Sequence, residues 1–352
     1  MPGSLISGYV LFKRRSRTMS IFKETPMEEF RDYDIRFPEL VYDIVDYFRI
    51  SNRVKEPAQK SVLDYCNNSR FNIPAPNREF IQPDTVHKIC ELLTKNRVLI
   101  CTRVGTSTEG FDSNYLFMPR NEDGFLQKHP AVVFRFNCLV YGFRFIYSTY
   151  REFVLPVIVK KDGDISMGTC FRFHSGILTA KHCLDVDEVC IPGFSSEQLN
   201  NCQVLMSEKG DIDLAYIELN QPSILVSDDA HVLDEVLVMG YPKIPQFFDF
   251  CAAERATVSS IPTRGVVASM ADQYLSKSAG QLMLVTARIR GGNSGGPIIG
   301  SNGAVVGVAF SEPMSKGDYD EMGYGIAYPI EVFYELLKNP LDMKVNFVDA
   351  IE

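Results

Sequence analysis

The stretch that decides the fold is Gly291-Gly292-Asn293-Ser294-Gly295-Gly296-Pro297, a serine set among four glycines. A serine hydroxyl is a weak nucleophile until a base takes its proton, and acyl transfer also needs preorganised N–H donors for an oxyanion. Glycines let the backbone turn sharply, so the N–H groups of Gly292 and Ser294 can point at one spot. We therefore take Ser294 as a candidate nucleophile and Gly292, Asn293 and Ser294 as a candidate oxyanion hole. The alternative is a glycine-rich turn between two strands that carries no chemistry.

The same stretch has the form Gly-x-Ser-x-Gly, which is also the nucleophile elbow of α/β-hydrolases. That architecture places its acid and its histidine after the serine. The five histidines of this chain, at positions 87, 129, 174, 182 and 231, all precede Ser294. Chain order therefore excludes a nucleophile elbow.

His182 is the best-placed candidate base, because it comes just after the short apolar run Gly176–Ala180. The other four histidines are expected to be structural or exposed. Two candidate acids, Asp211 and Asp213, precede the apolar run Leu214–Leu219. Residues two apart in a strand point to the same face, so periodicity does not choose between these two carboxylates.

Composition excludes several other classes of protein. The chain has 352 residues and a net charge of −8, with 21 Lys and Arg against 17 Asp and Glu in residues 1–150, and 15 against 27 in residues 151–352. These balances argue against a strongly basic nucleic-acid binder. No run of eighteen apolar residues lacks a charge, so no membrane span is expected. The nine cysteines are odd in number and form no Cys-x-x-Cys pair, which indicates free thiols in a reducing cytoplasm and no zinc site.

Two different patterns of apolar and polar residues predict two domains. Apolar residues at helical spacing predict helices at 40–48, 58–66 and 84–93, and extended runs at 98–104 and 115–118 predict a hairpin, together a winged-helix-like module. From Phe153 onward, short β-rich runs alternate with Gly, Pro and Asp turns, which is typical of an all-β barrel domain. The predicted divisions are a flexible arm (1–30), a winged-helix-like adaptor (31–128), a bridging helix (129–150), a peptidase domain (151–342) and a tail (343–352).

Residues 151–340 resemble trypsin-like serine peptidases of the chymotrypsin fold, closest to the HtrA-type and glutamyl-endopeptidase-like branches. Six motifs occur in the family's order. They are Gly168-Thr169-Cys170-Phe171, Ile177-Leu178-Thr179-Ala180-Lys181-His182, Asp213-Leu214-Ala215-Tyr216-Ile217-Glu218-Leu219, Val238-Met239-Gly240-Tyr241-Pro242, Gly292-Asn293-Ser294-Gly295-Gly296-Pro297 and Gly323-Tyr324-Gly325-Ile326-Ala327-Tyr328-Pro329. The resemblance implies a double β-barrel, six strands in each, and an α+β protein overall once the helical N-terminal domain is counted.

The resemblance also implies roles for individual residues. It implies a triad of His182, Asp213 and Ser294, and it selects Asp213 over Asp211 because the family's acid directly precedes the Leu-Ala pair. Arg288, six residues before the nucleophile, falls at the base of the primary specificity pocket, where it would favour an acidic substrate side chain. HtrA-type enzymes would instead suggest small or aliphatic residues at that position. Ala309, Phe310 and Ser311 fall on the strand that would pair with an extended substrate.

The chain departs from secreted trypsins in one respect that bears on its cysteines. Cys183 follows His182 as in those enzymes, but the position of its disulfide partner is not matched, so the disulfide is not carried over.

These expectations converge on a serine endopeptidase that cleaves a specific protein partner and is regulated through its N-terminal domain, by analogy with bacterial defence or signalling systems. No cofactor or metal is expected, because hydrolysis by a triad needs only water. The N-terminal domain is expected to bind a protein. DNA is the alternative partner, which would make the chain a DNA-tethered protease. A third alternative is a non-catalytic peptide-binding module on a peptidase fold.

Overall fold

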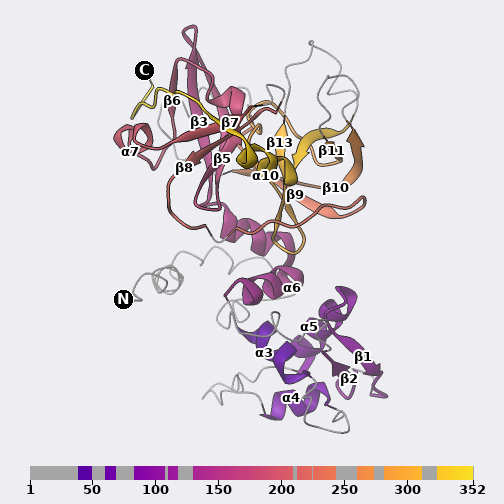
Figure 1. Cartoon of the computed structure of the whole chain (residues 1–352). Coiled ribbons are helices and arrows are strands. Elements are labelled where there is room, and N and C mark those ends of the chain that lie inside the picture. The colour runs from indigo at the N-terminus through magenta and orange to yellow at the C-terminus, as the bar shows by residue number, and fades with distance from the viewer. Residues whose placement is uncertain are drawn as a thin grey trace. The chain divides into compact units, whose positions relative to one another are not determined.

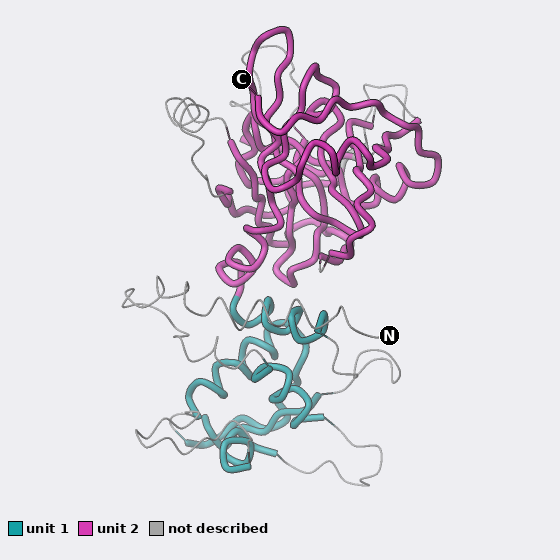
Figure 2. Tube along the Cα trace, turned by 90° about the vertical axis from the view of Figure 1, so that its left-hand side faces the viewer, with its two compact units in different colours: residues 1–141 teal, residues 142–352 magenta. Residues whose placement is uncertain are grey.

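The computed structural model describes residues 39–49, 60–68, 83–107, 110–117, 130–208, 212–223, 225–242, 260–272, 281–310 and 323–351. The chain divides into two compact units, Met1–Tyr141 and Gly142–Glu352 (Figure 2). The predicted arm at residues 1–30 lies outside the described residues, so that prediction stays open.

The N-terminal unit is built from helices followed by a hairpin, in the predicted order. Amphipathic spacing explains the helices: in α5, Val86, Ile89, Cys90 and Leu93 lie on one face and are fully buried. Ser61 and Asp64 exchange backbone and side-chain hydrogen bonds at the start of α4, as in a capping box. The elements are α3 (Leu40–Tyr47), α4 (Val62–Asn68), α5 (Pro83–Lys95), β1 (Ile100–Arg103) and β2 (Asn114–Leu116).

The long helix α6 (Pro130–Tyr150) is interrupted at Gly142, whose φ of 68° lies in the left-handed region that glycine tolerates. The two compact units divide at this glycine. Beyond it, the hydroxyls of Tyr147 and Tyr150 donate hydrogen bonds to the carbonyl oxygens of Ser260 (2.8 Å) and Gly303 (2.5 Å), which fix this half of α6 to the C-terminal unit. Among the helices that the structure describes, none combines the length and the apolar character needed to cross a bilayer.

Half of the C-terminal unit is a closed six-stranded barrel in the order β10-β11-β14-β13-β12-β9 (Figure 1). Its interior is filled by fully buried aliphatic side chains, among them Val238, Val267, Val285 and Ile298. The strands are β9 (Glu235–Gly240), β10 (Ile261–Asp272), β11 (Gln281–Val285), β12 (Pro297–Gly300), β13 (Val305–Phe310) and β14 (Gly325–Pro329).

The other half is a seven-stranded sheet in the order β15-β7-β8-β5-β4-β3-β6. The chymotrypsin-like fold class is confirmed, with one closed barrel and one half-barrel where we predicted two six-stranded barrels. The strands are β3 (Val154–Lys161), β4 (Asp164–Phe173), β5 (Gly176–Ala180), β6 (Glu188–Cys190), β7 (Val204–Ser207), β8 (Leu214–Glu218) and β15 (Pro340–Asp342), with the short helices η3 (Lys181–Cys183), α7 (Ser196–Asn200) and α10 (Glu331–Lys338).

The C-terminal segment, residues 340–351, contacts both edges of this half-barrel. β15 pairs with the edge strand β7, and Phe347 forms a bridge with Val189 of the opposite edge strand β6. The Asn200 side chain donates to the Phe347 carbonyl (3.0 Å) and accepts from its N–H (3.2 Å). The Phe347 ring is only 3% exposed. Residues 343–351, which we predicted to be a tail, are therefore part of the packed domain, because they supply backbone partners that the two edge strands otherwise lack.

Candidate active site

Sheet topology brings His182 and Asp213 to the same edge of the half-barrel. Strands β5 and β8 are antiparallel neighbours, with Ala180 opposite Leu214. His182 lies two residues beyond the end of β5, and Asp213 lies one residue before the start of β8. The end of one strand and the start of its antiparallel neighbour meet at one edge, so the two side chains are placed together by the register alone.

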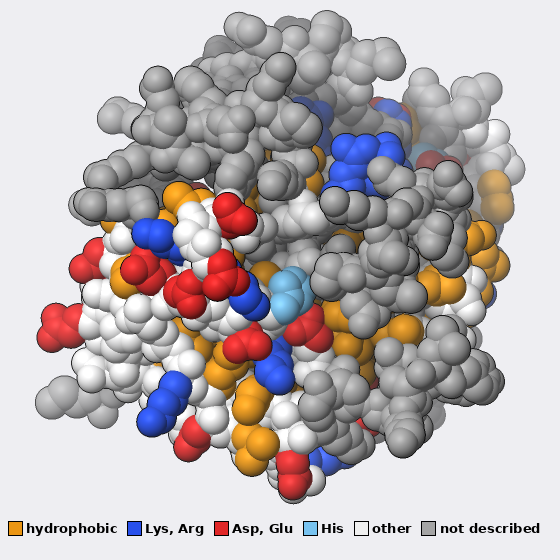
Figure 3. Space-filling view, turned by 90° about the horizontal axis from the view of Figure 1, so that it is seen from above, with side chains coloured by type: hydrophobic (Ala, Val, Ile, Leu, Met, Phe, Trp, Pro, Cys, Tyr) orange, Lys and Arg blue, Asp and Glu red, His pale blue; other side chains and the backbone are white. Residues whose placement is uncertain are grey.

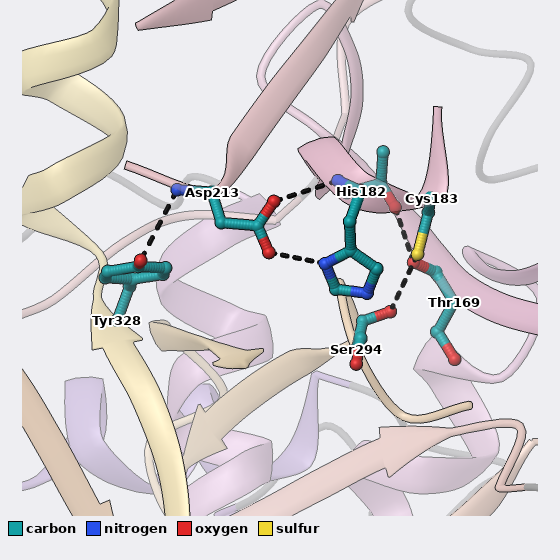
Figure 4. Close-up of polar contacts among 7 residues, drawn as sticks. Thr169, His182, Cys183, Asp213, Ser294 and Tyr328 are labelled. Atoms are coloured by element: carbon teal, nitrogen blue, oxygen red, sulfur yellow. Dashed lines mark hydrogen bonds and ion pairs between the residues drawn. The ribbon is translucent and has the colours of Figure 1, made fainter. Parts of the chain in front are cut away.

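Asp213 holds both the backbone and the ring of His182. Its Oδ1 accepts a hydrogen bond from the His182 backbone N–H at 2.8 Å, and its Oδ2 is hydrogen bonded to Nδ1 of the imidazole (Figure 4). Its backbone carbonyl accepts from the Lys181 N–H at 3.1 Å. In the neutral ring, a proton held on Nδ1 by the carboxylate leaves Nε2 as an acceptor. The imidazole is therefore fixed in orientation and in tautomer.

The carboxylate also changes the basicity of the ring. Burial lowers the pKa of the His182 imidazole, but the hydrogen bond to Asp213, with smaller contributions from Cys183, outweighs burial and raises the pKa to about 10. The side chain of His182 is 41% exposed, so its free nitrogen is accessible from solvent. Figure 3 shows one face of the molecule, on which Asp and Glu side chains lie intermixed with Lys and Arg side chains.

Ser294 lies in the turn-rich segment between β11 and β12, and the glycines before it form a defined turn. The Asn293 N–H donates to the Arg290 carbonyl at 2.9 Å, and Gly292 has a φ of 95°. A hydrogen-bonded turn with positive φ only at its third residue is type II, which requires glycine at that position. The N–H of Asn293 closes this turn. Of the predicted oxyanion donors, the N–H groups of Gly292 and Ser294 remain, and neither donates a hydrogen bond within the described part of the chain.

Ser294 faces the imidazole from the side opposite Asp213 (Figure 4). Ser294 is buried, at 4% exposure. Among the hydrogen bonds of the described residues, none joins the Ser294 hydroxyl to His182 Nε2. In enzymes without bound substrate this contact is often long and tightens only when the substrate arrives. Asp213, His182 and Ser294 thus lie next to one another in this order (Figure 4).

Residues 168–308 match the family model of the trypsin-like peptidase domain. This part of the chain is therefore similar to trypsin-like peptidase domains. No curated protein matches the chain significantly. Among solved structures, the HtrA-type protease AlgW with a bound tripeptide is 20% identical, with a TM-score of 0.41, and covers 55% of this chain and 61% of the AlgW chain. The active form of the Rv3671c protease from M. tuberculosis is 17% identical, with a TM-score of 0.44, and covers 67% of this chain and all of that one, 100%.

Of the predicted specificity residues, the structure places Arg288 at the surface and Phe310 in the interior. The Arg288 side chain is exposed, and its backbone carbonyl accepts from the Thr263 hydroxyl at 2.9 Å. Phe310 is buried, and its ring packs on Tyr328 with centroids 4.8 Å apart.

The predicted substrate strand already uses one of its residues internally. The Ala309 carbonyl accepts from the Gly295 N–H, and its N–H donates to the Gly296 carbonyl, both at 2.8 Å. A substrate strand could therefore begin to pair only beyond Ala309, from Phe310 onward. Ser311 and Asp211 lie outside the described residues.

The remaining histidines of the described ranges have local partners. His174 Nε2 contacts the Tyr334 hydroxyl (3.0 Å), His87 contacts the Tyr115 hydroxyl (3.3 Å), and His231 pairs with Asp234 (3.5 Å). These contacts agree with the expectation that the residues are structural or exposed. His129 lies outside the described residues.

The eight cysteines that the structure describes are all free, while Cys251 falls outside the described ranges. The Cys183 sulfur takes the space beside Gly168: a Cβ at Gly168 would lie 2.4 Å from it. The segment that faces Cys183 therefore presents glycine, which explains why no disulfide forms here. No group of three or more potential metal ligands occurs among the described residues.

Sequence reasoning assigned no role to two residues of the quoted motifs that prove to touch the site. Thr169 hydrogen bonds to the segment that carries Ser294, and the Tyr328 hydroxyl accepts from the Asp213 N–H at 3.4 Å (Figure 4). Each partner lies more than a hundred residues away in the chain. Motif spacing alone carries no signal for contacts of this range.

The pKa of His182 is directly measurable by NMR titration of the histidine ring nitrogens. We expect His182 to titrate well above 6.5, and Asp213→Asn to lower its pKa, because only the smaller contributions from Cys183 then oppose burial. Asp234→Asn, which removes the exposed partner of His231, should leave the His182 titration unchanged. A His182 pKa at or below 6.5 in the unaltered protein would contradict this electrostatic assignment.

Proposed function

We propose that this chain hydrolyses peptide bonds of a specific protein partner through an acyl-enzyme formed on Ser294. The observation that carries the proposal is the line of Asp213, His182 and Ser294, in which one carboxylate holds both the backbone and Nδ1 of the histidine. Ser294 is buried and lies beside the imidazole (Figure 4).

The mechanism follows from the protons and hydrogen bonds that these groups can still donate or accept. The Ser294 oxygen forms a bond to the scissile carbonyl carbon while Nε2 of His182 takes the hydroxyl proton. Asp213 stabilises the resulting imidazolium. The N–H groups of Gly292 and Ser294 donate to the developing oxyanion. The carbon–nitrogen bond then breaks, and His182 returns its proton to the leaving amine. A water molecule, deprotonated in turn by His182, cleaves the acyl-enzyme and regenerates the serine.

A fluorophosphonate probe tests this proposal directly, because it reacts covalently only with an activated serine. We expect stoichiometric labelling of the full chain, loss of labelling in Ser294→Ala, and unchanged labelling in Ser301→Ala, a surface-turn serine of the same domain. Ser294→Ala should leave the thermal unfolding midpoint almost unchanged, since one hydroxyl contributes little to the core. Equal labelling of Ser294→Ala, or no labelling of the unaltered chain, would refute the proposal for the isolated protein.

For specificity, we infer that Arg288 favours an acidic residue immediately before the scissile bond. A guanidinium pairs with a carboxylate through two parallel charge-assisted hydrogen bonds. The domain around it is acidic, with 15 Lys and Arg against 27 Asp and Glu in residues 151–352, so attraction of an acidic side chain would have to come from a local cation.

A peptide library varied at that position measures this preference. We expect Arg288→Gln to reduce the ratio of kcat/KM for acidic over small side chains by at least about tenfold, the loss of one charge-assisted hydrogen bond. Arg290→Gln, which removes an exposed arginine two residues away, serves as the control and should leave the ratio unchanged. A library in which small or aliphatic residues are preferred by both the unaltered protein and Arg288→Gln would favour the HtrA-type alternative.

For the N-terminal unit, we favour a protein partner that recruits or regulates the peptidase domain. On β1, Ile100 is 50% exposed, and the adjoining Val104 is 77% exposed, so apolar side chains are offered to solvent. Residues 1–150 carry only four more basic than acidic residues, which is little for a DNA-binding module. Binding of the full chain to duplex DNA with a steep salt dependence would instead favour the DNA-tethered alternative.

A further inference from the structure

Thr169 joins the half-barrel to the segment that carries Ser294. It lies on β4 and is fully buried. Its N–H donates to the Ser294 carbonyl at 3.0 Å, and its hydroxyl donates to the Gly292 carbonyl at 2.6 Å. The same hydroxyl oxygen accepts from the Tyr241 N–H at 3.0 Å, and the Thr169 carbonyl accepts from the Thr179 hydroxyl at 2.7 Å. Every polar group of this threonine is therefore used.

The two bonds to the Ser294 segment hold alternate peptide groups. The hydroxyl holds the carbonyl of Gly292, which belongs to the peptide between residues 292 and 293. The N–H holds the carbonyl of Ser294, which belongs to the peptide between residues 294 and 295. The unpaired N–H groups of Gly292 and Ser294 belong to the peptides that precede each of these. Thr169 thus fixes the neighbours of both proposed oxyanion donors and leaves the donors themselves free.

Surrounding glycines make room for this arrangement. A Cβ at Gly295 would lie 2.3 Å from the Thr169 carbonyl oxygen, and one at Gly240 would lie 3.0 Å from the Thr169 hydroxyl oxygen. A Cβ at Gly296 would lie 3.2 Å from the Thr169 methyl carbon. The glycines of the Ser294 motif therefore do more than allow a sharp turn, since they also let β4 approach closely enough for the threonine to bond.

The turn has few other anchors from side chains. Across the described residues, the other side-chain hydrogen bond to the backbone of residues 290–294 comes from the Cys183 thiol, at 3.9 Å from the Ser294 carbonyl oxygen. The Asn293 side-chain oxygen is buried without a partner. A type II turn becomes type I by rotation of its central peptide, here the one between residues 291 and 292, which reverses the direction of the Gly292 N–H.

We propose that Thr169 is a positioning residue for the oxyanion hole. Its hydroxyl keeps the Gly292 N–H directed at the substrate carbonyl, a role that rests on the proposed function. Loss of the hydroxyl leaves the peptide between residues 292 and 293 held by its Asn293 N–H to the Arg290 carbonyl but no longer by its own carbonyl, and the turn before it then samples orientations in which the Gly292 N–H points away. Oxyanion hydrogen bonds strengthen in the transition state, so the loss falls on kcat and leaves KM in place.

The test compares Thr169→Val, which keeps the shape and removes the hydroxyl, with Thr169→Ser, which keeps the hydroxyl and removes the methyl group. We expect Thr169→Val to lower kcat by about 10- to 100-fold with KM unchanged, less than the loss of a whole oxyanion donor. Thr169→Ser should stay within about threefold of the unaltered protein. The fluorophosphonate labelling rate should fall in the same proportion as kcat.

Tyr150→Phe is the control for the loss of a buried hydrogen bond. It removes a fully buried hydroxyl of the same unit, whose bond to the Gly303 carbonyl involves neither Thr169 nor residues 290–294. We expect it to lower the thermal unfolding midpoint as Thr169→Val does, with kcat changed by less than about threefold.

Two results overturn the proposal. One is an unchanged kcat in folded Thr169→Val, and the other is a loss of kcat in folded Thr169→Ser as large as that expected for valine. The result for Thr169→Ser tests the proposal even if Thr169→Val does not fold. Absence of labelling in the unaltered chain would instead refute the proposed function, so the two failures are distinguishable.

Discussion

The hydrogen bonds from Thr169 to the carbonyl oxygens of Gly292 and Ser294 are the contacts on which the site depends. The base and the acid belong to the half-barrel, whereas the serine belongs to the segment that enters the closed barrel. Catalysis needs these groups aligned to within tenths of an ångström. The bond from Asp213 N–H to Tyr328 crosses between the same two halves at the acid. The site therefore lies at the hydrogen-bonded interface between the half-barrel and the closed barrel (the seam). Neither of these two halves contains all of its residues.

Electrostatics at this seam is dominated by one carboxylate. Asp213 raises the pKa of His182 against the opposing effect of burial, which stabilises the protonated form of the ring. The same carboxylate fixes the backbone of the one-turn helix η3, which couples the geometry of the base to its basicity. Acidic residues predominate in the second half of the sequence, with 15 Lys and Arg against 27 Asp and Glu in residues 151–352.

Much of the fold, and the candidate residues His182, Asp213 and Ser294, could be predicted from the sequence because short motifs indicate them. Buried β-rich runs, the glycines around Ser294 and the Asp213-Leu214-Ala215 motif are local signals. Side-chain partners across the seam could not be predicted, since Thr169 and Gly292 are 123 positions apart and meet only through the register of two separate sheets. Residues 343–351, which we predicted to be a tail, pack against both edge strands instead: the Met343 N–H donates to the Val204 carbonyl, and Phe347 forms a bridge with Val189. The N–H of Asn293 illustrates the same limit: its place in the motif suggests an oxyanion donor, but the turn with Arg290 uses it.

The central claim is that the isolated chain holds an assembled acyl-transfer site. Pre-steady-state hydrolysis of p-nitrophenyl acetate tests it most directly, because a covalent acyl-enzyme releases the first p-nitrophenolate faster than later turnovers. We predict a burst that approaches about one equivalent per chain and disappears in Ser294→Ala. Linear release without a burst, or a burst that persists in Ser294→Ala, would contradict the account.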